Sequence, residues 1–196
     1  MSGGFFYFPV LGSTNDEARK FLSAREGTVL VADRQTKGKG RLGRKWFSPP
    51  GGLYFSVILK PRKAPKDLYK LTILAAVACA RAIKSTTGLS AALKWPNDIM
   101  LEGKKVGGIL TEGATRDKVS GIIIGVGINI ARQKFPRQIR DAAASLEGAA
   151  ARVAGDKLLK SILEEMEYWY LKFLTNDFTE CMAEYESLGG KRSIKH

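Results

Sequence analysis

Residues 34–46 read RQTKGKGRLGRKW, a segment with six lysines and arginines, three glycines and no acidic residue. Glycine allows the backbone to approach a bound group closely and to adopt a positive φ. Lysine and arginine supply charge-assisted donors that favour phosphate or carboxylate. The segment therefore predicts an anion-binding loop, and a solvated basic loop is the alternative interpretation.

Two nucleotide-binding motifs are excluded by what surrounds this segment. The spacing Gly38-x-Gly40-x-x-Gly43 fits the dinucleotide fingerprint, which must be followed directly by a helix. Residues 46–52, WFSPPGG, cannot begin one, because proline and glycine interrupt helices. A P-loop is excluded because no Gly-Lys-Ser/Thr sequence follows at the required distance.

Length and composition favour one globular domain. The chain has 196 residues, 44% hydrophobic and 26% charged, which is ordinary for a globular protein. Its two cysteines, Cys79 and Cys181, have no metal-binding spacing, and its single histidine, His196, excludes histidine-based catalysis. No signal segment or membrane-spanning apolar run is apparent, so a reduced, cytoplasmic protein with no membrane partner is expected.

The net charge of +13 suits nucleic acid, an acidic protein or small anions. No helix-turn-helix, zinc-finger or aromatic RNA-binding signature accompanies that charge, so we do not expect DNA as a partner. A basic nucleic-acid-binding module is retained as an alternative.

Hydrophobic periodicity and capping residues predict helices alternating with strands. Ser13 or Thr14 caps the first helix, Asp67 caps the second, and Gly88 ends the second. The helices are expected over residues 13–24, 67–87, 158–174 and 177–188. The strands are expected over residues 28–32, 53–59, 92–95, 99–102, 105–112 and 121–130. Short turns between strands predict an α+β fold with a mixed, mostly antiparallel sheet, and residues 132–148 are expected to form a long loop.

Three further segments place unusual residues in or beside strands. They are KWPND (94–98), KVGGIL (105–110) and GVGIN (125–129). Repeated glycine weakens a strand unless another group must approach its backbone closely, and Lys105 beside two glycines could meet a carboxylate or phosphate. Taken singly, each segment is explained better by a turn or surface role than by ligand binding.

Taken together and in order, these segments resemble the biotin–protein ligase family. The resemblance rests on Ser13-Thr14-Asn15, on Gln35 with GKGRLGRKW (38–46), and on the three segments above, and it covers roughly residues 10–190. The family includes the catalytic domain of the biotin ligase–repressor proteins. The resemblance implies the class II synthetase-like fold that biotin and lipoate ligases share, with a catalytic domain over residues 1–190 and a tail over 191–196. It also implies that the repressors' DNA-binding domain and the family's usual small C-terminal β-barrel are absent.

The implied activity has two steps. Biotin and ATP, with Mg²⁺, form biotinyl-5′-AMP, and the biotinyl group then passes to a lysine of a biotin carboxyl carrier protein. Homodimer formation is also implied by the family. A lipoate or octanoate ligase of the same fold is the alternative enzyme.

The resemblance also assigns residues. Catalysis is assigned to Lys105, Arg41 and Arg44, and no metal ligands are implied except that Asp98 is a candidate. Biotin contacts are assigned to Ser13, Thr14, Asn15, Gln35, Gly38, Lys39, Gly40, Arg41, Lys105 and Gly108. ATP contacts are assigned to Arg44, Trp46, Lys94, Asn97 and Asn129. Lys39 stands where the family usually has arginine, and residues 132–148 match too loosely to assign an adenine contact.

Overall fold

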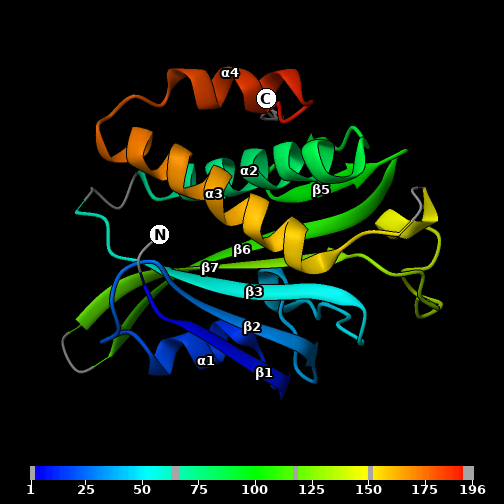
Figure 1. Ribbon diagram of the computed structural model, residues 1–196, viewed down its shortest axis with the longest axis horizontal. Helices are drawn as coiled ribbons and strands as arrows, with labels where there is room; N and C mark the ends of the chain where they lie inside the picture. Colours follow the sequence, from blue (N-terminus) through cyan, green and yellow to red (C-terminus); the bar gives the residue numbers. More distant parts are fainter. Residues whose placement is uncertain (1–2, 63–66, 117–118, 150–151, 192–196) are drawn as a thin grey trace.

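The computed structural model describes residues 3–62, 67–116, 119–149 and 152–191. Within these residues, one seven-stranded sheet has the order β1-β2-β3-β7-β6-β5-β4 (Figure 1). The strands are β1 (Phe5–Leu11), β2 (Thr28–Gln35), β3 (Gly52–Leu59), β4 (Ala92–Lys94), β5 (Asp98–Leu101), β6 (Lys104–Arg116) and β7 (Val119–Asn129).

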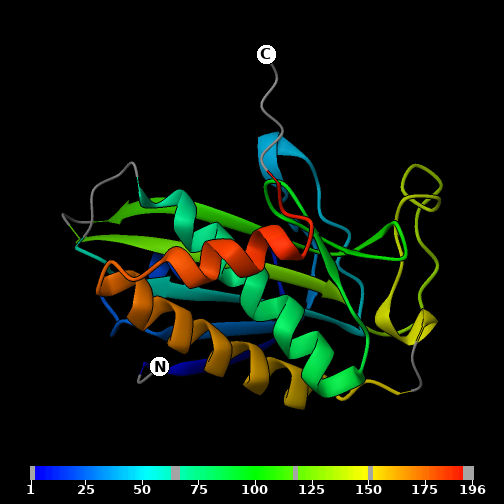
Figure 2. The same cartoon turned by 90° about the horizontal axis from the view of Figure 1, so that it is seen from above.

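Helices cover both faces of the sheet. α2 (Tyr69–Thr87), α3 (Gly155–Leu174) and α4 (Thr179–Ser187) lie on one face, and α1 (Thr14–Lys20) lies on the other (Figures 1 and 2). The predicted tail over residues 191–196 lies, apart from Lys191, outside the described residues.

The pairing confirms the predicted mixed, mostly antiparallel sheet. β1 pairs with β2 in parallel, and the other neighbouring strands pair antiparallel. β1 was not predicted from the sequence. It is an edge strand whose side chains are mostly exposed, and Pro9 falls at an unpaired position within it, so it lacks the alternating pattern of a half-buried strand.

One predicted helix end and one predicted helix start need correction. α1 begins as predicted after Ser13, whose hydroxyl accepts from the Asp16 amide at 3.5 Å, but α1 ends at Lys20 rather than near Ala24. α2 has Leu68 at its N-cap, and no side chain caps it; Asp67 instead pairs with Lys70 at 2.9 Å. Gly88 ends α2 as predicted, in the left-handed region with φ 77°.

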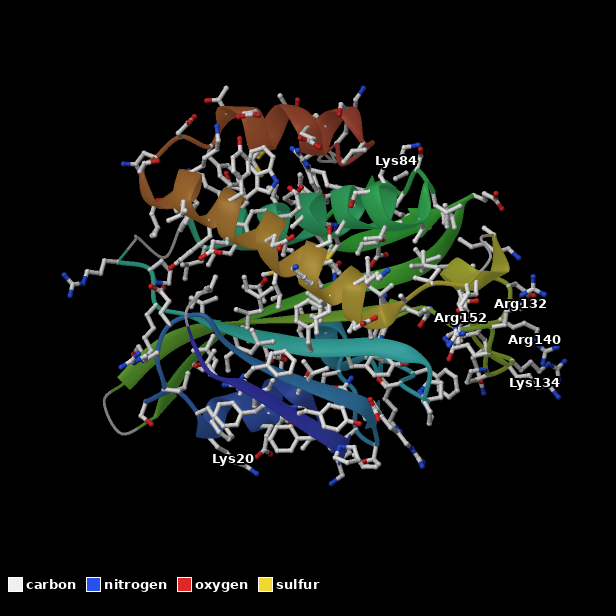
Figure 3. The ribbon with its side chains drawn as sticks, viewed as in Figure 1. Lys20, Lys84, Arg132, Lys134, Arg140 and Arg152 are labelled. Atoms are coloured by element: carbon white, nitrogen blue, oxygen red, sulfur yellow. The ribbon has the colours of Figure 1, made fainter. Side chains whose placement is uncertain are left out.

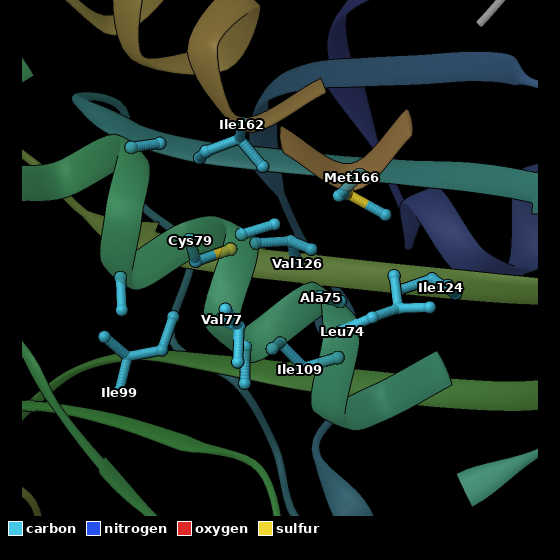
Figure 4. Close-up of a cluster of buried hydrophobic side chains, with 14 of the residues drawn as sticks. Leu74, Ala75, Val77, Cys79, Ile99, Ile109, Ile124, Val126, Ile162 and Met166 are labelled. Carbon is cyan, nitrogen blue, oxygen red and sulfur yellow. The ribbon is translucent and has the colours of Figure 1, made fainter. Parts of the chain in front are cut away.

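The main core lies between the sheet and α2 and α3. On β7, alternate residues Ile122, Ile124, Val126 and Ile128 belong to this cluster, which Figure 4 shows in close-up. The predicted apolar stripe of α3 is buried as expected, with Trp169 fully buried. The intervening residues of β7 face α1, so the two faces of this strand serve different purposes.

Both cysteines are free and buried in helices, Cys79 in α2 and Cys181 in α4. Burial raises the pKa of the Cys181 thiol to about 12. In the part of the chain that the structure describes, no helix combines the length and apolar character needed to cross a membrane.

Candidate functional site

A glycine-lined floor forms the base of the site on the α1 face of the sheet. Gly127 of β7 is paired with Gly108 of β6, and Gly125 of β7 follows on the same face. A Cβ added at Gly125 would lie 2.1 Å from the Asn15 amide oxygen, and one at Gly127 would lie 2.4 Å from the Trp46 indole nitrogen. The alternating glycines therefore make room for two of the protein's own side chains, which in turn line a cavity.

Lys105 and Trp46 meet above this floor. The Lys105 ammonium lies 5.3 Å from the centre of the Trp46 ring and 2.5 Å from a carboxylate oxygen of Asp98. Gly108 lies beneath both, since a Cβ there would be 3.4 Å from the ammonium and 3.6 Å from the indole. The Lys105 side chain is 31% exposed and lines the cavity.

Buried amides and hydroxyls form one end of the cavity. Ser13, Thr14 and Asn15 are each 3% exposed. The side-chain amide oxygen of Gln35 accepts from the Thr14 backbone amide at 2.8 Å and from the Thr14 hydroxyl at 3.2 Å. Asn15 accepts from Ser56 at 2.7 Å and donates to Glu112 at 2.7 Å. These hydrogen bonds fix the orientation of the polar groups, which favours selective recognition of a polar ligand.

The basic glycine segment forms a small hairpin over the cavity. The Gly40 amide donates to the Arg44 carbonyl at 2.7 Å, and the Trp46 amide donates to the Gly38 carbonyl at 2.9 Å. Leu42, with φ 56°, is at the tip and 85% exposed. No α-helix follows this hairpin, in agreement with the exclusion of a dinucleotide-binding motif.

Two side chains of the hairpin bind other elements. Lys39 pairs with Asp16 of α1 at 2.5 Å, and a guanidinium nitrogen of Arg41 donates to the Asn97 amide oxygen at 3.5 Å. The hairpin therefore bridges the cavity from α1 to the segment 94–98.

The segment 94–98 forms the opposite wall. Asn97 donates from its side chain to the Ile109 carbonyl at 2.7 Å, which fixes it against β6. Asp98 begins β5 and faces Lys105, so it does more than complete a turn. Lys94, at the end of β4, is exposed at the cavity wall.

The long loop predicted over residues 132–148 closes a further side of the cavity. The Lys105 amide donates to the Ala142 carbonyl at 2.8 Å, and the Ala144 amide donates to the Lys105 carbonyl at 2.9 Å. Asn129 donates from its side chain to the Ala144 carbonyl at 3.0 Å. The backbone of Lys105 therefore holds this loop beside its own ammonium group.

The resulting cavity has a volume of about 530 Å³. Every predicted site residue lines it except Gly38, where a Cβ would meet Ser48 and the Trp46 carbonyl at 2.5 Å. Gly38 therefore allows the close packing of the hairpin base.

Sequence reasoning did not assign several apolar residues that line the same cavity. They are Leu42, Phe47, Trp95, Pro96, Phe135, Ile139, Ala142 and Ala143. Phe47 and Trp95 adjoin motif residues in the sequence, and that position could have indicated that they line the cavity. In contrast, nothing in the sequence of residues 132–148 indicated which side chains face the cavity.

The donor set limits what metal the site could hold. The described residues contain no group of three His, Cys, Asp or Glu side chains suited to a metal, and Asp98 is the one carboxylate among the cavity-lining residues. Mg²⁺ is commonly held by one or two carboxylates together with substrate phosphates. A single carboxylate, Asp98, therefore suits a metal ion that arrives bound to a nucleotide. It suits an ion held permanently by the protein less well.

The sequence model of the Biotin/lipoate A/B protein ligase family matches residues 7–129, the region that carries every motif of the cavity floor and hairpin. The chain belongs to this family. The curated family members include the bifunctional ligase/repressor BirA of Bacillus subtilis, which is 40% identical over 194 residues, covering 95% of this chain and 60% of BirA. Another is the biotin–[acetyl-CoA-carboxylase] ligase of Paracoccus denitrificans, 37% identical over 123 residues, covering 61% of this chain and 51% of that ligase.

A solved family structure has the same fold. The biotin protein ligase from Aquifex aeolicus in complex with biotin and ATP superimposes with a TM-score of 0.86 at 34% identity, covering 94% of this chain and 77% of that chain. This likeness confirms the predicted class II synthetase-like fold of the biotin and lipoate ligases. The present chain spans 60% and 51% of the lengths of the two curated relatives above.

Proposed function

We propose that this chain is a biotin–protein ligase that forms biotinyl-5′-AMP from biotin and ATP and transfers biotin to a lysine of a biotin carboxyl carrier protein. One observation carries the proposal: a single cavity joins a rigid set of buried amides and hydroxyls to a lysine and a basic hairpin. The names of the relatives and of the Aquifex structure support the same substrates.

The polar end suits the ureido ring of biotin. Thr14, Asn15 and Gln35 are already held in set orientations by hydrogen bonds to other protein groups, so a ligand whose polar groups do not match that arrangement would bind less tightly. The carboxylate of a ligand bound there would extend over the glycine floor toward Lys105.

The first step joins two anions. The biotin carboxylate oxygen attacks the α-phosphorus, the bond from that phosphorus to the bridging oxygen breaks, and pyrophosphate leaves. Lys105, Arg41 and Arg44 are among the cations that line the cavity, and we assign to them the role of offsetting the repulsion and the developing charge. To bind substrate, the Lys105 ammonium would exchange its contact with Asp98 for the substrate carboxylate and phosphate.

Mg²⁺ bound with ATP would offset phosphate charge, and Asp98, with the amide oxygen of Asn97 nearby, would hold it. Lys94 and Asn129 lie on the cavity walls that would contact the nucleotide.

In the second step, the acceptor amine attacks the acyl carbon, the bond to the AMP oxygen breaks, AMP leaves, and the amine loses a proton. Water would destroy the same anhydride, so the site must exclude it. The hairpin bridge through Arg41 and Asn97, with the tryptophan beneath it, supports that role.

Incubation of the chain with biotin, ATP, Mg²⁺ and a carrier domain tests the function. We expect pyrophosphate release and a mass increase of the carrier that corresponds to one biotinyl group. A parallel reaction with lipoate or octanoate tests the alternative, because modification by these acids and not by biotin would make the chain a ligase of that kind.

We also propose a cytoplasmic location, which agrees with two free thiols. A homodimer is proposed from the family, and the exposed apolar edge of β1 offers a surface for it, with Phe5 59% and Tyr7 56% exposed. Sedimentation over a range of protein concentrations would test the oligomeric state.

A further inference from the structure

The loop that follows β7 carries cations without counterions. Residues 131–152 contain five basic and two acidic residues, a net charge of +3. The five basic residues, which we name the basic rim, are Arg132, Lys134, Arg137, Arg140 and Arg152, and all five are exposed. Within the described residues, none has a carboxylate oxygen within 4.0 Å. Many lysines and arginines elsewhere pair with carboxylates, for example Arg19 with Glu112.

The basic rim lies beside the cavity mouth. Figure 3 shows Arg132, Lys134, Arg140 and Arg152 together at one end of the molecule, and Lys20 and Lys84 away from them. Phe135 and Ile139, which alternate with rim residues along the loop, line the cavity.

The loop is fixed in this position. Its backbone is bonded to Lys105, and the Phe135 ring contacts the Phe47 ring of the hairpin segment with centroids 6.4 Å apart. These contacts hold the loop that carries the rim residues at a defined place beside the hairpin segment.

We propose that the basic rim is the docking surface for an acidic face of the acceptor domain, an inference that rests on the proposed function. The acceptor lysine is a cation at neutral pH and must approach a cavity bordered by cations. Carboxylates around that lysine offset this repulsion and steer the encounter, because complementary charge raises the association rate. The partner is therefore a protein domain with carboxylates surrounding its target lysine.

A pair of matched double variants tests the docking surface in the full chain. K134E/R140E reverses two rim charges, and K20E/K84E reverses two remote charges, so both change the net charge equally. We expect kcat/KM for a carrier domain to fall about tenfold at low salt in the rim variant and by less than about twofold in the control. Added salt should shrink the difference.

Adenylate formation and its capture by hydroxylamine need no docked protein, so both should be unchanged in the rim variant. A carrier domain whose carboxylates near the target lysine are changed to amides should no longer distinguish wild type from the rim variant. Equal losses in the two double variants, or an equal loss of hydroxylamine capture, would overturn the proposal.

Binding of a fluorescent carrier domain, followed by anisotropy, separates docking from catalysis. If wild type forms no adenylate, the proposed function fails, and rim-dependent carrier binding still supports docking. If the rim variant loses affinity for duplex DNA but keeps wild-type affinity for the carrier, the surface is a nucleic-acid site and the proposal is wrong.

Discussion

Lys105 belongs at once to a strand, an ion pair and an aromatic contact. Its backbone holds the loop beside β6, while its ammonium group lies between Asp98 and the Trp46 ring. A substrate anion would compete with Asp98 for the same ammonium group. Backbone hydrogen bonds therefore fix where Lys105 lies, whereas its proposed role in catalysis depends on its ammonium group.

Replacement of Lys105 by alanine should lower adenylate formation about 100-fold or more, because the cation between the two reacting anions is lost. Pyrophosphate release measures the effect. Replacement of the exposed neighbouring residue Lys104 by alanine is the control, and that variant should retain wild-type activity. Similar activity in the two variants would show that Lys105 has no catalytic role.

Gly127→Ala should displace Trp46, because the new Cβ would lie 2.4 Å from the indole nitrogen and 2.7 Å from Cε2. We expect a change in tryptophan emission. If the displacement costs about 1.4 kcal/mol in the transition state, adenylate formation falls about tenfold. Gly113→Ala in β6 is the matched control, since a Cβ there meets nothing within 4 Å. An unchanged emission spectrum in Gly127→Ala would contradict the packing described here.

The sequence motifs located most of the cavity lining and predicted close approach to the strand glycines, but they did not identify the approaching groups. Strand glycines predicted that some group approaches the sheet closely, and the groups that do so are Asn15 and Trp46. Such contacts join residues up to 110 positions apart, as between Asn15 and Gly125, so no local pattern specifies them. The roles of the individual lining residues stay predictions.

The hairpin combines a rigid base with an exposed tip. Backbone hydrogen bonds of Gly40 and Trp46 fix its base, whereas Leu42 at the tip adopts a positive φ and is exposed to solvent. Contacts of Lys39 and Arg41 with α1 and the opposite wall span the cavity. This arrangement suits a segment that opens for substrate and closes over an intermediate.

Arg41→Gly should release biotinyl-5′-AMP into solution, because it removes the contact with Asn97 and adds backbone freedom to the hairpin. Chromatography of the reaction mixture should find at least about tenfold more free adenylate than with wild type, a change equivalent to about 1.4 kcal/mol of retention. Lys37→Gly, outside the cavity lining, is the control. Wild-type retention of the adenylate in Arg41→Gly would exclude this clamp.

Elements with strong periodicity were predicted well, and those defined by long-range pairing were not. The apolar stripe of α3 and the glycine end of α2 matched the structure. β1 was missed because its partner, β2, is parallel and its own side chains are largely exposed. The inward residues of the loop after β7 were missed because backbone bonds to Lys105 decide their direction.

The two faces of the sheet have different roles in folding and in the candidate site. The larger core lies under α2 and α3, and the cavity lies on the α1 face.

Leu74→Ala, at a fully buried position of α2, should lower the free energy of unfolding by about 2–5 kcal/mol. Urea unfolding measures it, and Leu171→Ala, 58% exposed on α3, should change it by about 0.5 kcal/mol or less. Equal effects would contradict the packing of α2.

The alternation along β7 has a consequence for substitutions in this strand. Ile124, Val126 and Ile128 contribute to folding, whereas Gly125, Gly127 and Asn129 shape the chamber behind them. A substitution at Gly125 or Gly127 would therefore reshape the chamber by displacing Asn15 or Trp46, while the packing of the neighbouring core residues stays the same. A change in the shape of this end of the chamber would therefore require paired substitutions, one at the strand glycine and one at the side chain that the glycine admits.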